Sequence, residues 1–310
     1  MTRAYTNGEG VTYQRTGARR SQARPLLGME NNQIGSVLPW DSNDVVRIAV
    51  IDTGRPIDNA MANLPNKPID VGGEPKDQAD AITDLYLDPV AGHGTFIAGL
   101  LARVAPGCAI RVFQALTSFG DGKETDIAAT ILSVLDDNKP PHILSLSFSG
   151  YTLDHPTCLH TAIKAAINAG VVVVASAGND GISRKAYPAA FEGVVSVAAL
   201  GPSGPAPFSN WGSWVRACAP GVDIPSTFWH FDGRAHERYG VDPDRYEGWA
   251  TWSGTSFSAP IVAGAIAKTM KAQSISGNDA VEVLIDQPGL LRLPCYGTVI
   301  NELAARPRFA

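Results

Sequence analysis

The chain has 310 residues, of which 45% are hydrophobic and 18% charged, so it can bury a large core as one or two globular domains. Its formal net charge of −5 argues against nucleic acid or an anionic membrane as the general partner. No window approaches the run of about 18 apolar residues that a membrane-spanning helix needs, and residues 1–28 contain no apolar signal-peptide core. We therefore expect a cytoplasmic protein, with secretion as the alternative.

Residues 1–40 are polar, contain Gly and Arg and show no periodicity, which predicts a mobile N-terminal tail or short pro-segment. The folded domain is then expected over residues 41–310. The stretch "GARRSQAR" makes the tail locally basic.

From residue 45 onward, short β-branched runs alternate with Ala-rich helical patterns. Strands that are apolar on both faces and interleaved with helices are typical of a parallel sheet covered on both sides. We therefore predict an α/β fold, a three-layer α/β/α domain with a mainly parallel, doubly wound sheet. The predicted strands are 45–51, 109–116, 142–149, 171–178 and 194–200, and the predicted helices are 94–104, 126–137 and 158–170.

The segment 229–250 interrupts this alternation with mixed charges and aromatic residues. A long loop insertion is the expected structure, and it either overhangs a binding cleft or is a solvated surface loop. The small-residue run "IVAGAIAK" at 261–268 predicts a buried helix shortly after the insertion.

Three polar residues stand at the ends of predicted apolar elements: Asp52, His93 and Ser256. Ligands of open α/β sheets bind beyond the carboxyl ends of the strands, which makes such residues functional candidates. Each also has a structural explanation when taken alone. Asp52 can start a turn, His93 can be a satisfied structural histidine, and the Ser256 hydroxyl can cap a helix.

Together, Asp, His and Ser are the parts of an acyl-transfer site. A serine hydroxyl becomes a nucleophile when an imidazole removes its proton, and a carboxylate holds that imidazole in the required tautomer. Asn179, which ends the most apolar strand, can donate its side-chain amide to an oxyanion or simply occupy a turn. The helix start behind Ser256 adds backbone N–H groups near the same charge.

Four motifs in this order resemble those of the subtilisin-like serine proteases: "AVIDTG", "GHGTFIAG", "SAGNDG" and "GTSFSAPIVAGA". "SLSFSG" and "FSNWG" resemble further family segments, so the similarity extends from about Val45 to Met270. The resemblance implies a serine endopeptidase that forms an acyl-enzyme on Ser256 of an Asp52/His93/Ser256 triad. It also implies Asn179 as an oxyanion donor, together with the Ser256 backbone N–H.

The resemblance further implies a strand that pairs with an extended peptide substrate. The residues expected along the substrate are Ser147, Phe148, Ser149 and Gly150. Asp180 is expected at the rim of the pocket for the residue before the scissile bond, where a carboxylate would favour Lys or Arg. Ser149 replaces the usual glycine of the family, which is expected to narrow the cleft.

A loop that binds calcium after the histidine helix in many secreted members is deleted here, so we predict no calcium at that position. We also expect no cofactor and no metal at the candidate site, with weaker calcium or sodium sites elsewhere as an open alternative, and a monomer that acts on peptides or proteins. Similarity to mycosins and to leader-cleaving proteases of ribosomal peptide pathways implies a processing protease with narrow specificity. The alternative function is a non-catalytic or autoinhibited peptide-binding relative.

The four cysteines have no C-x-x-C spacing, so structural thiols or disulfide bridges are expected in place of a zinc site. They are Cys108, Cys158, Cys218 and Cys295.

Overall fold

The fold was analysed in a computed structural model that describes residues 2–6, 11–15, 23–26, 34–56, 77–83, 86–152, 156–235 and 243–303. Its centre is a nine-stranded sheet. The strands are β4 (Arg47–Asp52), β5 (Ala109–Gln114), β7 (Ile143–Leu146), β8 (Val172–Ser176), β9 (Val195–Gly201), β10 (Gly204–Pro205), β11 (Ala217–Pro220), β14 (Arg292–Leu293) and β15 (Gly297–Val299). Neighbouring strands pair in parallel except at β10 and β14, which confirms the predicted mainly parallel sheet.

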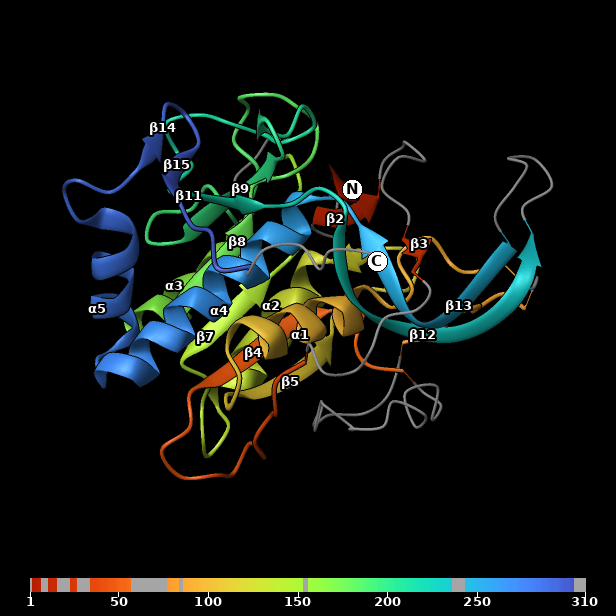
Figure 1. Cartoon of the computed structure of the whole chain (residues 1–310), viewed down its shortest axis with the longest axis horizontal. Helices are drawn as coiled ribbons and strands as arrows, with labels where there is room; N and C mark the ends of the chain where they lie inside the picture. Colours follow the sequence, from red (N-terminus) through yellow and green to blue (C-terminus); the bar gives the residue numbers. More distant parts are fainter. Residues whose placement is uncertain are drawn as a thin grey trace, which may run out of the picture.

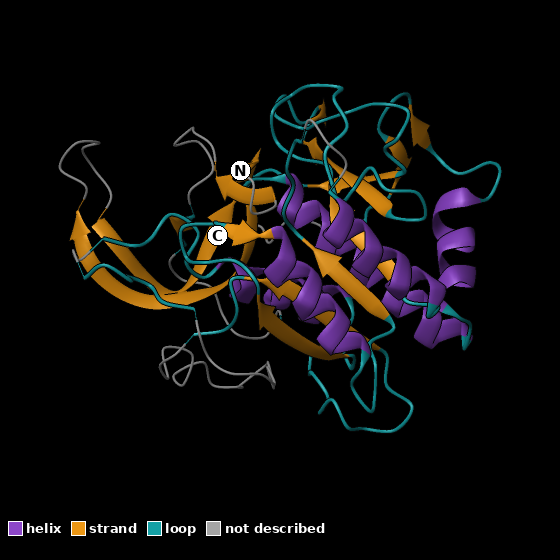
Figure 2. Cartoon of the chain, turned by 180° about the vertical axis from the view of Figure 1, so that it is seen from behind, coloured by secondary structure: helices purple, strands orange, loops and turns teal. Residues whose placement is uncertain are grey.

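Helices cover both faces of this sheet, as Figures 1 and 2 show. Side chains alternate along β4, so Ile48 and Val50 enter one core while Ala49 and Ile51 enter the other. The first core contains α1 (His93–Val104) and α4 (Thr255–Gln273), and the second contains α2 (Glu124–Leu135) and α3 (Thr157–Asn168). The three-layer α/β/α architecture is confirmed. The short helix α5 (Gly277–Val281) and the π-helix η5 (Glu282–Asp286) follow α4.

The order of the strands reverses its direction of winding at β4. The chain passes from β4 to β5 on one side, and then crosses to β7, β8 and β9 on the other. The carboxyl ends of β4 and β7 therefore lie at the point where the winding reverses, which is where doubly wound sheets bind ligands. Asp52 is the last residue of β4, and Ser147 directly follows β7.

The prediction of a loop insertion at 229–250 is wrong for residues 229–235 and 243–250, and its remaining part lies outside the described residues. Strands β12 (Ile224–Ala235) and β13 (Pro243–Trp252) pair antiparallel and form a long hairpin, drawn as the curved arm in Figure 1. Large aromatic side chains in its base are buried: Trp229 is 3% exposed and Trp249 is 5% exposed. Burying these rings stabilises the strand pairing, whereas the mixed charges and aromatic residues of the segment led to the prediction of a long loop.

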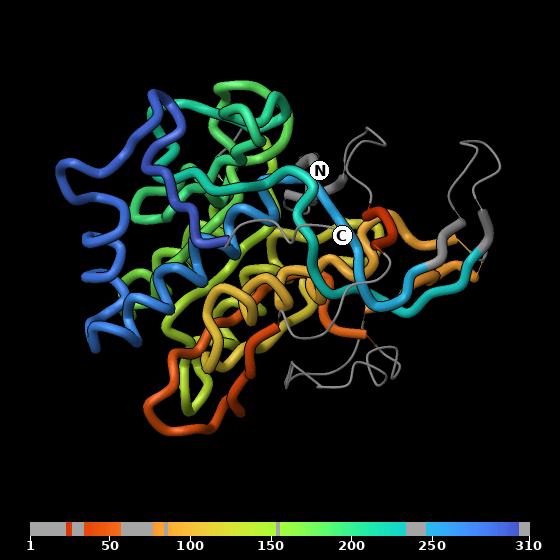
Figure 3. Tube along the Cα trace, viewed as in Figure 1, coloured from red at the N-terminus to blue at the C-terminus, as the bar shows by residue number. Residues whose placement is uncertain are grey.

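The described parts of residues 1–40 do not form the separate tail that the sequence predicts. Strands β1 (Thr2–Thr6) and β2 (Val11–Arg15) pair with each other, and β2 also pairs with β6 (Gly122–Lys123). Strand β3 (Arg24–Pro25) pairs with β13, and Figure 3 shows this early segment beside the hairpin. Ala23 is 7% exposed and belongs to the core under α1 and α4. The domain therefore begins before residue 41.

Candidate active site

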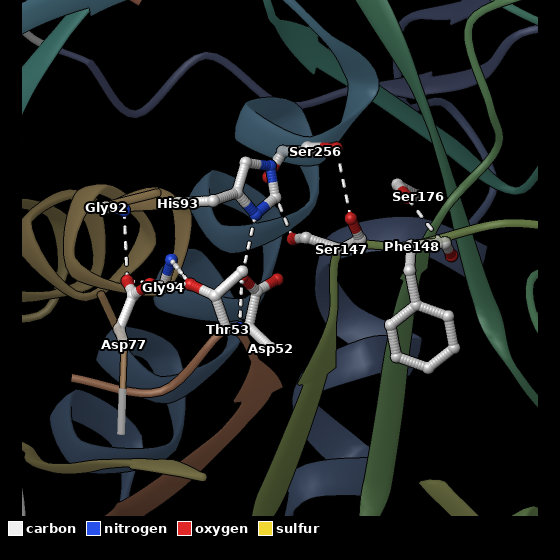
Figure 4. A network of polar contacts seen from close by, with 10 residues as sticks. All are labelled: Asp52, Thr53, Asp77, Gly92, His93, Gly94, Ser147, Phe148, Ser176 and Ser256. Carbon is white, nitrogen blue, oxygen red and sulfur yellow. Dashed lines mark hydrogen bonds and ion pairs between the residues drawn. The ribbon is translucent and has the colours of Figure 1, made fainter. Parts of the chain in front are cut away.

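The end of β4 and the start of α1 bring Asp52 and His93 into contact. Oδ1 of Asp52 lies 2.8 Å from Nδ1 of His93, as drawn in Figure 4. The backbone N–H of Thr53 donates to the same oxygen at 2.8 Å. Asp52 is fully buried and His93 is 6% exposed, so water screens this contact little. A carboxylate in this position holds the imidazole with Nδ1 protonated and leaves Nε2 to accept a proton.

Glycines on both sides of His93 make this close approach possible. Gly92 has a φ of 78°, and a Cβ there would lie 2.4 Å from the indole of Trp229. A Cβ on Gly94 would lie 2.6 Å from the carbonyl oxygen of Gly54 in the turn after β4. Small residues therefore let the hairpin pack against one side of α1 and the turn after β4 approach the other.

Aromatic rings surround the imidazole. The ring centroid of Trp252, the last residue of β13, lies 5.3 Å from that of His93 in an edge-on arrangement. The ring of Phe257 lies 5.4 Å away on the side of α4. Trp252 and Phe257 also contact each other and Phe96, so one packed cluster fixes the ring plane of His93.

Ser256 lies in the first turn of α4, and its hydroxyl does not cap the helix. The cap residue is Gly254, and no side chain makes a capping bond there. The Ser256 hydroxyl donates to the carbonyl oxygen of Ser147 at 3.1 Å, and the Ser147 hydroxyl donates to the carbonyl oxygen of Ser256 at 2.8 Å. Figure 4 shows the imidazole of His93 between Asp52 and Ser256.

Asn179 is fixed by a residue that the sequence interpretation did not use, Thr255. The backbone N–H of Thr255 donates to Oδ1 of Asn179 at 2.7 Å, and the Thr255 hydroxyl donates to the same atom at 2.8 Å. Both bonds occupy the acceptor end of the side-chain amide, which leaves Nδ2 as the end that can donate to a ligand. Thr255 stands next to Ser256 in the motif "GTSF", but nothing in that motif predicts a contact with Asn179.

The segment from Ser147 to Gly150 follows β7 and is not part of the strand. Phe148 is 3% exposed and its ring belongs to the core under α2 and α3, pointing away from Ser256 in Figure 4. Gly150 exchanges two backbone hydrogen bonds with Tyr187, each 2.9 Å long. The Ser149 hydroxyl lies beside Gly178, where a Cβ would be 3.1 Å from it.

Asp180 is exposed, and its carboxylate already has a partner in the structure. The phenol of Tyr151 donates to Oδ2 of Asp180 at 2.7 Å, and the side chain of Asn210 donates to the same phenol at 2.6 Å. Burial and the neighbouring Asp180 raise the pKa of Tyr151, so the phenol stays a donor at neutral pH. The residues next to Asp180 in the sequence do not predict this hydrogen-bond network, because Tyr151 and Asn210 are distant in the chain.

Asp77 is a second buried carboxyl group beside the candidate residues, and the sequence interpretation missed it. Its Oδ2 accepts hydrogen bonds from the Thr53 hydroxyl and from the backbone N–H of Gly92, both at 3.0 Å. Burial raises the pKa of Asp77 well above its ordinary value of 3.8, and the charges of Asp52 and Asp88 act in the same direction. Asp77 lies far from the motifs in the sequence, and no local pattern distinguishes it.

Among the described residues, no group of three or more His, Cys, Asp or Glu side chains could hold a metal ion. All four cysteines are free thiols, the first of the two expected alternatives. Within the described parts of the chain, no helix has the length and apolar composition needed to cross a membrane.

Residues 43–287 match the model of the subtilase family, peptidase S8. The chain is 34% identical over 255 residues to a thermophilic serine proteinase of Bacillus sp. (strain AK1), covering 77% of this chain and 56% of that protein. It is 32% identical over 236 residues to subtilisin E of Bacillus subtilis (strain 168), covering 72% and 54%. The chain thus spans a little over half the length of these curated relatives.

The fold also matches the crystal structure of a lanthipeptide protease, with a TM-score of 0.66 and 23% identity. That match covers 83% of this chain and 85% of the other. The family model covers most of the chain, and the relatives share its sequence over more than two thirds of its length. The chain is therefore a member of the subtilase family.

Proposed function

We propose that the protein is a serine endopeptidase that cleaves peptide bonds through an acyl-enzyme on Ser256. The contact between Asp52 and His93 carries this proposal, because a buried carboxylate on Nδ1 has its chemical use in preparing Nε2 as a base. Family membership supports the same activity.

In the proposed reaction, Nε2 of His93 takes the hydroxyl proton of Ser256 while Oγ attacks the carbonyl carbon of the substrate. The negative charge on the carbonyl oxygen is met by Nδ2 of Asn179 and the backbone N–H of Ser256. The C–N bond then breaks, and the imidazolium gives its proton to the leaving amine. A water molecule, activated by the same imidazole, hydrolyses the ester and restores the Ser256 hydroxyl.

This sequence of steps requires one small movement. The Ser256 hydroxyl donates to the carbonyl oxygen of Ser147 and must exchange this bond for one to Nε2 of His93 before its proton is transferred. Reorienting one hydroxyl group is fast on the scale of a catalytic step. We infer that the contact with Ser147 belongs to the substrate-free state.

Labelling with a fluorophosphonate, followed by intact mass spectrometry, tests the proposal. We expect one adduct on the wild-type chain and none on Ser256→Ala. Ser258→Ala is the matched control, because Ser258 lies in the same helix and its hydroxyl is bound to the carbonyl oxygen of Pro220. This variant should keep the adduct. An unlabelled wild type would reject the proposed activity and favour the non-catalytic peptide-binding relative.

We further propose narrow specificity in the processing of a peptide or protein substrate. The Ser149 side chain beside Gly178 supports this, since it occupies space that a glycine would leave open. The lanthipeptide protease supports it only by likeness of fold. Ser149→Gly should widen the range of residues accepted before the scissile bond, as a peptide library would measure. An unchanged cleavage pattern would contradict this role of Ser149.

A preference for Lys or Arg before the scissile bond also remains part of the proposal. The carboxylate of Asp180 is exposed and bound to Tyr151, so we expect Asp180→Asn to lower the preference for Arg over Leu only a few-fold. No change in that ratio would remove Asp180 from the proposal. The cytoplasmic location and the monomeric state likewise remain predictions, to be tested by cell fractionation and sedimentation.

A further inference from the structure

The carboxyl group of Asp77 lies against the turn that follows β4. The backbone N–H of Asp77 donates to the carbonyl oxygen of Arg55 at 2.8 Å, and Pro56 and Asp77 form a parallel β-bridge. The side chain is fully buried. The proposed reaction makes no use of it, although burying a carboxyl group costs free energy unless it is neutral or well bonded.

Hydrogen bonds connect this carboxyl group to both halves of the Asp52–His93 contact. Oδ2 of Asp77 accepts from the hydroxyl of Thr53, the residue after Asp52. The same oxygen accepts from the backbone N–H of Gly92, the residue before His93. One atom thus joins the end of β4 to the start of α1.

A second link reinforces the first. The Thr53 hydroxyl, while donating to Asp77, accepts from the backbone N–H of Gly94 at 3.1 Å. Gly94 is the residue after His93. The residues on both sides of the histidine are therefore hydrogen-bonded to this pair, Gly92 to Asp77 and Gly94 to Thr53 (Figure 4). Such a network restrains the backbone from which the imidazole projects.

The protonation state of Asp77 suits this role. Its Oδ1 is buried and has no hydrogen-bond partner within the described part of the chain, so it can carry the proton while Oδ2 accepts two bonds. Burial and the charges of Asp52 and Asp88 raise the pKa of Asp77, which favours this neutral form. A neutral acid ties the backbone together without placing a second negative charge beside Asp52.

We propose that Asp77 is a positioning residue that holds the imidazole of His93 against the carboxylate of Asp52. The expected effect of Asp77 on catalysis rests on the proposed function. The effect of Asp77 on the position of the imidazole does not, because the contact between Nδ1 of His93 and Oδ1 of Asp52 is present without substrate.

Two substitutions at Asp77 distinguish the effect of its hydrogen bonds from the effect of its ionisable carboxyl group. Asp77→Asn keeps an oxygen that accepts from Thr53 and Gly92, whereas Asp77→Ala removes it. Glu124→Ala is the control, since Glu124 is a buried acid that accepts from the backbone N–H of Leu159 between α2 and α3. The control variant should lose stability without disturbing His93.

Three measurements are made on each variant: kcat and KM for a peptide substrate, the melting temperature, and the low-field NMR resonance of the His93 Nδ1 proton. The resonance is recorded with Ser256→Ala present, so it requires no activity, and is assigned by its loss in His93→Ala. Asp77→Ala should lower kcat by about 10- to 100-fold with little change in KM, and should shift or broaden the resonance. Asp77→Asn should keep both near wild type, and Glu124→Ala should lower only the melting temperature.

A wild-type kcat and resonance in Asp77→Ala, with only a lower melting temperature, would overturn the inference. An Asp77→Asn variant as impaired as Asp77→Ala would also overturn it, because the charge and not the hydrogen bonds would then matter. If the wild type hydrolyses no peptide, the proposed function fails, and the resonance alone decides the role of Asp77.

Discussion

Asp52 and Asp77 are both fully buried, yet their partners give them different roles. Oδ1 of Asp52 faces the imidazole of His93, a group that can become a cation and stabilise a carboxylate. Asp77 faces a hydroxyl and a backbone N–H, neither of which carries charge. Two buried carboxyl groups close to one imidazole in space thereby differ in role, one as a proposed catalytic group and the other as a proposed support.

The raised pKa of Asp77 makes a prediction about stability. Above its ordinary value of 3.8, the unfolded chain releases a proton that the folded chain retains, so the free energy of unfolding falls as pH rises toward the folded pKa. The slope within that window is about 1.4 kcal/mol per pH unit. Asp77→Asn does not titrate and should gain stability relative to wild type from about pH 4 upward.

Urea unfolding at a series of pH values, with Ser256→Ala present in both chains to prevent autolysis, measures this difference. The exposed Asp136 provides the control, because Asp136→Asn should follow the pH dependence of the parent chain. Parallel stability curves for Asp77→Asn and its parent would show that Asp77 is ionised in the folded state.

The proposed role of Asn179 as an oxyanion donor leads to a prediction about kcat. Removing one preorganised donor to an oxyanion costs roughly 10²- to 10³-fold in kcat, as it does in the related subtilisin. Asn179→Ala should show this loss with little change in KM. Thr255→Val keeps the donor but removes one of the two bonds on Oδ1, and should lower kcat less. Steady-state kinetics, normalised by titration with the fluorophosphonate, would contradict the role of Asn179 if both variants kept wild-type kcat.

At the scale of elements, the hairpin β12–β13 supports the helix that carries His93. Trp229 packs on Gly92 at the start of α1, and Trp252 places its ring edge-on to the imidazole. The hydroxyls of Ser226 and Thr227 donate to backbone carbonyl oxygens in the first turn of α1. An element expected to be a loop therefore contributes part of the wall of the candidate site.

Gly92→Ala tests this packing. A Cβ there would lie 2.4 Å from the Trp229 indole, and the φ of 78° adds backbone strain. We expect a loss of about 2–5 kcal/mol in the free energy of unfolding, combining about 1–2 kcal/mol of left-handed strain with overpacking. Activity should fall together with stability.

Gly170→Ala is the matched control for this substitution. Gly170 has a φ of 80°, but a Cβ there would have no neighbour within 4 Å. This variant should therefore lose only the strain contribution, about 1–2 kcal/mol, and keep full activity. Equal losses from the two alanines in urea unfolding would mean that contact with the hairpin adds nothing.

At the scale of the whole molecule, the site is assembled where the winding of the sheet reverses. Asp52 ends β4, and Asn179 follows shortly after the end of β8. His93 is the first residue of α1, and Ser256 is the second residue of α4. Residues as far apart in the sequence as Asp52 and Ser256 meet because parallel strands bring their carboxyl ends to one edge. Subtilase membership and the three-layer fold agree with this assembly.

The N-terminal region makes a prediction at this scale. If the protease prefers basic residues, it should cut its own chain in "GARRSQAR". Arg24 lies in β3, which pairs with β13, and this pairing protects the peptide bond after Arg24. Prolonged incubation should remove residues up to 19 or 20, with Ser256→Ala unchanged. Intact mass spectrometry decides, and an uncut wild type that cleaves other basic peptides would exclude self-processing.

Several features could be predicted from the sequence because they depend on neighbours along the chain. The apolar run before Asp52, the glycines around His93 and the small residues after Ser256 each specify a local structure and together match the family motifs. The alternation of strands and helices predicted the layers of the fold for the same reason. Element boundaries differed from the prediction by a few residues, because helix ends depend on local caps such as Gly92 and Gly254.

Other features were decided only by the tertiary structure. These features join segments that are distant in the sequence or were predicted to be loop or tail. They are the strand pairing of 224–252, the burial of Ala23, the hydrogen bond from Thr255 to Asn179 and the placement of Asp77. Hydrogen bonds and burial between such segments depend on where each segment is carried by the fold, and no local periodicity encodes that position. The sequence by itself determined the alternating strands and helices of the central layers and the residues of the candidate triad, whereas tertiary packing decided the hairpin, the placement of the first strands and the contacts that hold the candidate residues in place.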